Sequence, residues 1–192
     1  MKNEIIFFDI ETTGLDKKND SIIQFAAKKY DKESGKRTDE ICLYINNKVT
    51  LPAIITELTG ITQEKIESEG ISPRDAVRQA VKFLGKAPVL GGHNIDRFDI
   101  PFLENYFARY RTAVSTAGTM DTLSLSRKFL SQSPRLVRRN KRGERSMKLG
   151  DLVEQLGIAD GLSFHNALDD VEASIRLYEY IETLKKSIGI AA

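Results

Sequence analysis

Two acidic residues, Asp9 and Glu11, follow a short apolar run at positions 5–8. Alternate residues of a β-strand point to the same face about 6.6–6.8 Å apart, so both carboxylates would leave the same face of a strand. Two carboxylates aimed together repel each other unless a cation lies between them, and hard oxygen ligands suit Mg²⁺ or Mn²⁺. The pair therefore predicts a divalent-metal site, although a strand end that enters a loop would also produce this pattern.

A second acidic group lies in the segment 91–99, just past a predicted strand end. Asp96 and Asp99 are both candidates for a third metal ligand, and their spacing does not separate them. Either could equally be an ordinary carboxylate at the N-terminus of a helix, where the macrodipole favours an acid. Asn94 in the same segment is expected to support the turn, or to be a plain Asx-turn residue.

A third group, His165 with Asp169 and Asp170, precedes or begins a predicted helix. A histidine ahead of a helix with acids in its first turn could be a simple capping arrangement. With Leu168 and Val171 turned toward the sheet, Asp169 falls nearly opposite the core at about 100° per residue, whereas Asp170 lies at the edge of the buried face. Helical periodicity therefore favours Asp170 as a metal ligand and Asp169 as a solvated charge.

Taken together, the three groups resemble the three exonuclease motifs of the DnaQ-like family, in the branch called DEDDh because of its third-motif histidine. The resemblance is carried by Phe8-Asp9-Ile10-Glu11-Thr12-Thr13-Gly14-Leu15, by His93-Asn94 with Phe98-Asp99, and by His165 followed five positions later by Asp170. It covers the chain from residue 4 to about 180. Among relatives, the chain is most similar to the epsilon-type proofreading exonucleases of bacterial replicative DNA polymerases. One departure is Thr59, where many such relatives have His, so no role is assigned to it.

The resemblance implies a catalytic site and its cofactors. Asp9, Glu11, Asp99 and Asp170 would hold two divalent cations, Mg²⁺ or Mn²⁺, and His165 would be the general base. The implied activity is 3′–5′ exonuclease hydrolysis of phosphodiester bonds at the 3′ end of DNA, in proofreading or repair, with release of nucleoside 5′-monophosphates.

The resemblance also implies contacts with the substrate. Leu15 and Ile61 match positions that pack against the terminal base or sugar, although ordinary apolar packing explains them equally well. Thr12 and Thr13 would approach the terminal nucleotide mainly through backbone groups.

Other functions stay open at this stage. The expected partner is nucleic acid with a single-stranded 3′ end, and DNA is favoured only by the closer resemblance to the proofreading group. An RNA 3′–5′ exonuclease is the alternative within the enzyme class, and a non-catalytic nucleic-acid-binding or polymerase-associated module is the alternative outside it. The sequence leaves open whether the protein docks on a DNA polymerase subunit.

The elements that must position these residues follow from the apolar patterns. Three strands come first and are joined without helices, which argues against receiver or phosphatase-type folds, because those alternate strands and helices from the start. The predicted strands are 4–10, 21–30, 38–46, 88–91 and one near 119–120, with a hairpin turn at 31–36; the predicted helices begin at 72 and near 100, 122, 149 and 167. This order suggests an α/β protein, and the resemblance implies a ribonuclease H-like mixed five-stranded sheet, with an antiparallel 1-2-3 meander and parallel strands 4 and 5, flanked by helices.

The segment 131–148 is predicted to be a long basic loop. Residues 135–148 contain seven Arg or Lys and a single acid, a local charge of +6 in a chain whose net charge is +2. Such a loop could track a phosphate backbone, and it could equally be a solvated surface loop. The predicted substrate contacts within it are Arg138, Arg139 and Arg142.

Composition limits the remaining possibilities. The chain has 192 residues and is expected to form a single exonuclease domain over 1–192. No apolar stretch approaches the ~20 residues needed to span a bilayer, so no membrane association is expected. Acidic residues interrupt the short apolar run at positions 5–8, so that run is not expected to act as a secretory signal, and Cys42 is the only cysteine. A reducing, cytoplasmic location is the expectation.

Overall fold

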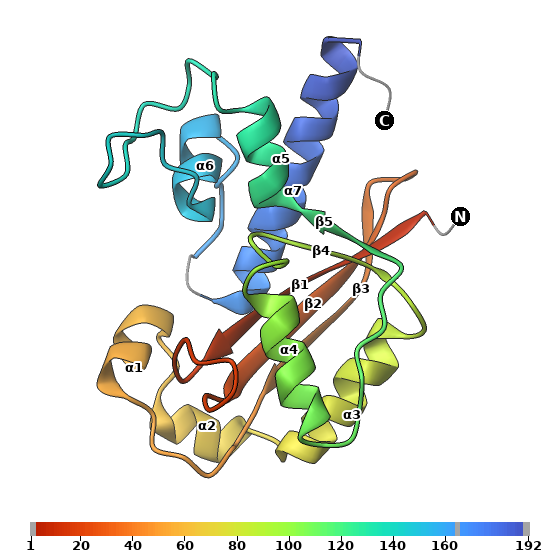
Figure 1. Cartoon of the computed structure of the whole chain (residues 1–192), viewed down its shortest axis with the longest axis vertical. Coiled ribbons are helices and arrows are strands. Elements are labelled where there is room, and N and C mark those ends of the chain that lie inside the picture. The colour runs from red at the N-terminus through yellow and green to blue at the C-terminus, as the bar shows by residue number, and fades with distance from the viewer. Residues whose placement is uncertain (1–2, 164–165, 190–192) are drawn as a thin grey trace.

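The computed structural model describes residues 3–163 and 166–189, and its centre is a five-stranded sheet in the order β3-β2-β1-β4-β5 (Figure 1). The strands are β1 (Glu4–Thr12), β2 (Ile22–Asp31), β3 (Lys36–Tyr44), β4 (Val89–Gly92) and β5 (Gly118–Asp121). The first three form an antiparallel meander, and β4 pairs in parallel with both β1 and β5. This is the predicted sheet. The third strand begins two residues earlier than expected, because Asp31 closes a tighter hairpin by accepting hydrogen bonds from Ser34.

The central strand β1 is apolar on both faces because helices cover both. Ile6 and Phe8 point into a core that α3 (Pro73–Leu84) and α4 (Asp99–Ala108) cover. Ile5 and Phe7 point the other way, against α7 (Ala167–Ser187). Since side chains alternate along a strand, Asp9 and Glu11 continue the face that α7 covers.

Two further helices form a second layer on α7. These are α5 (Thr122–Phe129) and α6 (Leu149–Leu156), and their apolar residues join those of α7 in one buried cluster. Between them, the described chain of 131–148 contains turns and one isolated bridge, Arg139–Arg145, and no helix. Buried Leu136 and Ser146 anchor this basic loop, which Figure 1 shows extending beside α6.

Two short helices were absent from the sequence prediction. They are α1 (Ala53–Thr59) and α2 (Gln63–Glu69), seven residues each, and they lie near the end of β1 (Figure 1). Each helix has only seven residues, and α1 buries none of them while α2 buries only Ile66, so both are too short for a periodicity argument to identify.

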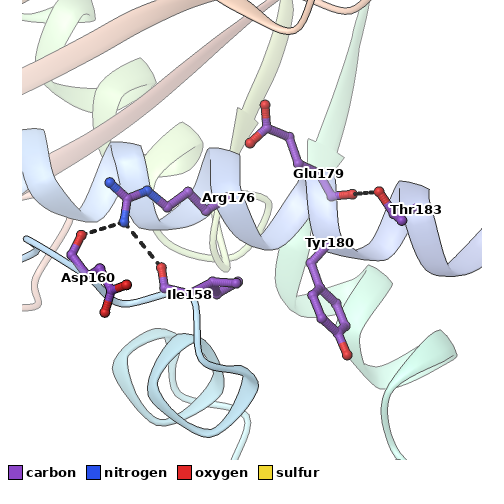
Figure 2. A pocket seen from close by; sticks show the side chains of 6 residues that line it. All are labelled: Ile158, Asp160, Arg176, Glu179, Tyr180 and Thr183. Carbon is purple, nitrogen blue, oxygen red and sulfur yellow. Dashed lines mark hydrogen bonds between the residues drawn. The ribbon is translucent and has the colours of Figure 1, made fainter.

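Hydrogen bonds from an α7 arginine hold the chain that leaves α6. Figure 2 shows Arg176, on α7, donating to the backbone carbonyls of Ile158 and Asp160, at 3.3 and 2.7 Å. Glu179 and Tyr180 line the same pocket of about 360 Å³. These contacts fix the direction from which the chain returns to the start of α7. Among the described residues, no helix is both long and apolar enough to cross a bilayer.

Packing between β1 and β4 leaves no room at Gly91. A Cβ atom built there would lie 2.7 Å from the ring of Phe7 and 2.9 Å from Ile5. We expect Gly91→Ala to lower the free energy of unfolding by ~1–3 kcal/mol, because overpacking a filled core forces side chains from their rotamers. Urea denaturation measures this. In a Gly91→Ala/Phe7→Leu double variant, the loss should be smaller than the sum of the two single losses; strict additivity would contradict the packing argument.

Candidate active site

Three acidic side chains meet where β1 leaves the core. One carboxylate oxygen from each of Asp9, Glu11 and Asp170 can be chosen so that all three lie within 4.8 Å of one another. Asp9 and Glu11 come from the end of β1, and Asp170 comes from the first turn of α7. The structure therefore brings together residues 161 positions apart, from 9 to 170, as the metal-site prediction requires.

A buried glutamine joins the start of α7 to the sheet. Gln24 is 1% exposed and pairs with Glu11 across β1 and β2. Its side-chain oxygen accepts a hydrogen bond from the backbone N–H of Ala167, at 3.3 Å. Asn166 caps the same helix by accepting from the N–H of Leu168. The sequence analysis missed Gln24, and its signal was a single amide side chain inside an otherwise apolar run at 22–27.

The structure separates Asp99 from Asp96. Asp99 is 4% exposed and begins α4, whereas Asp96 is exposed. β4 pairs with β1 only as far as Phe7, and beyond that point the backbone N–H of Ile10 lies close enough to the Asp99 carboxylate to favour its charged form. Asp99 therefore lies beside the tip of β1, next to the three clustered acids.

Asp121 holds the turn that leads to Asp99. Its two carboxylate oxygens accept hydrogen bonds from the backbone N–H groups of Asn94 and Asp96, at 3.1 and 3.3 Å, while one of them also caps α5. Asn94 has φ of 66°, a left-handed conformation that asparagine tolerates better than most residues. The backbone of Asn94 is therefore part of a turn that Asp121 holds, and the predicted contact of Asn94 with substrate stays a prediction.

Burial and mutual repulsion raise the pKa values of these acids. Burial raises the pKa of Asp9 well above its usual range, and Asp99, Asp170 and Glu11 raise it further. The same two effects, with burial the larger, raise the pKa of Glu11 to about 8. Burial also raises the pKa of Asp99 to about 7. A group of partly buried carboxylates that resists ionisation suits a divalent cation, because the cation removes the repulsion and supplies the missing solvation.

A cavity of about 610 Å³ opens onto this cluster. Asp9 and Asp170 form part of its lining, with His93 and Asn94 beside them. The remaining lining residues come from the end of the basic loop and from α6, namely Arg138, Lys148, Leu149, Gly150, Asp151 and Glu154. The acids therefore face a space large enough for a nucleotide-sized ligand.

The residues predicted to contact substrate near the first strand have different environments. Leu15 is 81% exposed at the loop after β1, whereas Ile61 is 3% exposed and packs in a small buried cluster. Ordinary packing accounts for Ile61, and a substrate contact there stays a prediction. The hydroxyl groups of Thr12 and Thr13 are used within the loop, donating to the Gly14 carbonyl and to Asp20.

The predicted arginines of the basic loop also differ from one another. Arg138 lines the cavity and forms ion pairs with Asp151 and Glu154. Arg139 and Arg142 are exposed and do not line that cavity. Asp169 is half-buried and accepts a hydrogen bond from the N–H of Ser163, so it is less solvated than expected.

One predicted site residue cannot be placed. His165 lies outside the described residues, and its assignment as general base stays a prediction.

A protein-family model matches most of the chain. The exonuclease family model, RNase_T, matches residues 6–178. The chain belongs to the exonuclease family. This membership confirms the DnaQ-like resemblance predicted from the three motifs.

Relatives of this exonuclease chain are much longer than it is. Over 186 residues the chain is 31% identical to the PolC-type DNA polymerase III of Mycoplasma genitalium, covering 96% of this chain and 12% of the polymerase. Over 187 residues it is 31% identical to the 3′-5′ exonuclease DinG of Bacillus subtilis, covering 96% of this chain and 18% of DinG. The chain thus spans less than a fifth of the length of these curated relatives.

Solved structures confirm the ribonuclease H-like fold. E. coli Exonuclease I in complex with a dT13 oligonucleotide has a TM-score of 0.84 at 22% identity, covering 96% of this chain and 42% of that one. A product-bound structure of exonuclease I has a TM-score of 0.82 at 23% identity, with 95% and 44% covered.

The raised pKa of Glu11 predicts how metal and pH act on stability. Because the folded protein holds this proton more tightly than the unfolded chain, metal-free protein should lose stability as the pH rises from near 4.5 toward about 8. We expect Glu11→Gln in EDTA to melt at a higher temperature than the wild type at the upper end of this range. Mn²⁺ should raise the wild-type melting temperature more at high pH than at low pH, since protons compete with the cation. Scanning calorimetry checks both effects; a Mn²⁺ shift of equal size in Glu11→Gln would contradict them.

Proposed function

We propose that this chain is a metal-dependent 3′–5′ exonuclease that hydrolyses the terminal phosphodiester bond of a DNA strand and releases nucleoside 5′-monophosphates. The observation that carries the proposal is the meeting of carboxylate oxygens of Asp9, Glu11 and Asp170 within 4.8 Å of one another, two of these acids also lining a cavity. The acids present carboxylate oxygens, which are suitable ligands for a divalent cation and poor general acids while a cation is bound.

The 3′–5′ direction of hydrolysis and the DNA substrate are inferred from two similar proteins. DinG of Bacillus subtilis is a 3′-5′ exonuclease, and E. coli Exonuclease I has been crystallised with dT13. We extend these properties to this chain because each match covers 96% of this chain and includes its acidic residues. The matched PolC-type polymerases make proofreading, and association with a polymerase, part of the same proposal.

Asp9, Glu11, Asp99 and Asp170 would hold the cofactor, two divalent cations of Mg²⁺ or Mn²⁺. When bound, such a pair stabilises the negative charge that develops on the attacking and leaving oxygens of an in-line displacement. Asp9, whose pKa is raised by burial and by the other three acids, would hold a cation together with Glu11 and Asp170. Asp99, behind the tip of β1, would act directly or through water.

The remaining roles belong to residues that handle the water and the strand. His165 would take the proton from the attacking water, a task suited to a group with a reference pKa near 6.5. Leu15, exposed in the loop after β1, would pack on the terminal base. The backbone of Thr12 and Thr13, whose hydroxyl groups are already engaged, would contact the terminal sugar.

Two alternatives are decided by the same assay. An RNA 3′–5′ exonuclease would use the same acids, and a binding module would use none of them. Digestion of 3′-labelled single-stranded DNA, mismatched duplex DNA and RNA, with Mg²⁺, Mn²⁺ or EDTA, separates the three functions.

Loss of the central carboxylate should abolish catalysis. We expect Asp9→Asn to lower kcat on single-stranded DNA by at least ~10³-fold, because it removes a charged metal ligand where transition-state charge is stabilised. His165→Ala should lower kcat by ~10²–10⁴-fold as a lost general base. Asp39→Asn on the exposed edge of β3 is the matched control and should keep wild-type activity. Near-normal turnover in Asp9→Asn would refute the assignment.

The side chain of Leu15 should contribute to substrate binding. We expect Leu15→Ala to raise KM by roughly threefold to tenfold with a smaller change in kcat, because stacking against a base is worth ~1–3 kcal/mol for a larger aromatic side chain and less for leucine. Steady-state kinetics on single-stranded DNA measure the change. Ile188→Ala removes another exposed apolar side chain, just past the end of α7, and should leave KM unchanged. Equal KM values for the two variants would exclude Leu15 from the substrate site.

A further inference from the structure

The cavity that opens onto the acids is also lined by two cationic residues. Arg138 and Lys148 are the two cations among its lining residues, which include Asp9 and Asp170. A strand whose terminal phosphate reaches the acids through this cavity would pass these lining residues. The two cations are therefore candidates for holding a backbone phosphate, and their environments distinguish them.

Arg138 is already neutralised. Its Nη1 lies 2.8 Å from the carboxylate of Asp151 and also contacts Glu154. Its backbone N–H donates to the side-chain oxygen of Gln155 at 2.7 Å, as does the N–H of Val137. All three partners belong to α6, so Arg138 fastens the basic loop to that helix. A phosphate could reach its charge only by breaking an ion pair with two carboxylates.

Lys148 differs from Arg138 in its ion pairing. It is exposed, and the salt bridges of the described residues include none to it. The acid that it influences is Asp151, whose pKa it helps to lower, but Asp151 already pairs with Arg138 and accepts from Ser146. Its ammonium group is thus free to take an anionic ligand.

The backbone at Lys148 is held firmly beside the site. His93 Nε2 lies 2.9 Å from the carbonyl of Met147, and because a carbonyl only accepts, Nε2 carries the hydrogen. Buried Ser146 accepts from the N–H of Lys148 at 3.5 Å, and Lys148 is the N-cap residue of α6. Since His93 follows β4 directly, this bond ties the end of the basic loop to the strand that leads to Asp99.

We propose that Lys148 binds a backbone phosphate of the nucleic-acid strand in this cavity, whereas Arg138 shapes the cavity wall and binds no phosphate. The inference rests on the proposed nuclease function for the presence of a strand. It assigns a substrate contact to a residue outside the predicted set and removes Arg138 from that set. Lys148 thereby acts as a positioning residue that fixes the path of the strand.

Salt dependence of binding separates the two cations. The probe is a 5′-fluorescein-labelled dT oligonucleotide whose 3′-terminal linkages are phosphorothioates, bound with Mn²⁺ and followed by anisotropy between about 50 and about 200 mM KCl. We expect Lys148→Ala to weaken binding roughly threefold to tenfold and to reduce the slope of log K against log salt by about 0.7, the value for one phosphate contact on a single strand. Lys148→Arg should restore the slope. Lys36→Ala, on the far hairpin, controls for the loss of one positive charge.

Arg138→Gln tests the second half of the proposal. It should lower the melting temperature, because Asp151 and Glu154 lose their partner, and it should keep the wild-type salt slope. A reduced slope in Arg138→Gln, or a wild-type slope in Lys148→Ala, would overturn the assignment. Where the wild type binds the probe but does not digest the unmodified oligonucleotide, the nuclease proposal fails and the slopes still test Lys148. Wild-type protein that binds no oligonucleotide at any of these salt concentrations would overturn both.

Discussion

The carboxylates of Asp9, Glu11 and Asp170 repel one another at close range inside a partly buried site, and the rest of the structure must hold them there. Each ionised acid makes ionisation of the next less favourable, so the metal-free site opposes folding at neutral pH and above. Apolar packing on both sides offsets this. Phe7 packs edge-on against Tyr30 and also meets Tyr178 of α7, immediately beneath the acids. This aromatic packing holds the carboxylates close together despite their repulsion. A bound divalent cation would relieve that repulsion.

The two-residue period of β1 links this core to the chemistry. The same alternation that presents Phe7 to α7 presents Asp9 and Glu11 to the first turn of that helix. A slip of one residue in strand register would send both acids to the opposite face, where α4 lies. Burial of the apolar side chains therefore fixes the register of β1, and this register places Asp9 and Glu11 in the site. Gln24 adds a polar lock, since its hydrogen bond to the N–H of Ala167 fixes the helix end against the sheet at the level of Glu11.

Local periodicity was enough to predict which residues share a face, and insufficient where the answer depended on distant partners. It placed Asp9 with Glu11, and its preference for Asp170 over Asp169 agrees with the acidic cluster. It could not separate Asp99 from Asp96, because the turn before them is held by Asp121 from another strand. The helices α1 and α2 were missed because they bury almost nothing of their own.

Charge content was the weakest guide of all. The basic loop was correctly located between two helices, but a count of its cations could not show that Arg138 is neutralised by α6. The sequence also did not predict which apolar side chains are exposed. Leu15 and Ile61 are both apolar and were both expected to contact substrate, but Leu15 is exposed and Ile61 lies in a buried cluster. Pairing and burial are tertiary properties, and each depends on residues more than ten positions away in the chain.

The charges of the cavity explain why Arg138 is needed even without touching a phosphate. Its lining residues include four acids, Asp9, Asp170, Asp151 and Glu154, against the two cations Arg138 and Lys148. With neutral His93, which burial favours by lowering its pKa, the lining carries two net negative charges. Glu11 and Asp99 add two further negative charges around the same ions, so the proposed pair of divalent cations would bring the site to about neutral. Without Arg138, the α6 acids would stand uncompensated beside the substrate path, and the site would keep a net negative charge even with both ions bound. An arginine locked in ion pairs therefore favours anion binding by removing repulsion, while a neighbouring lysine without such pairs supplies the attraction.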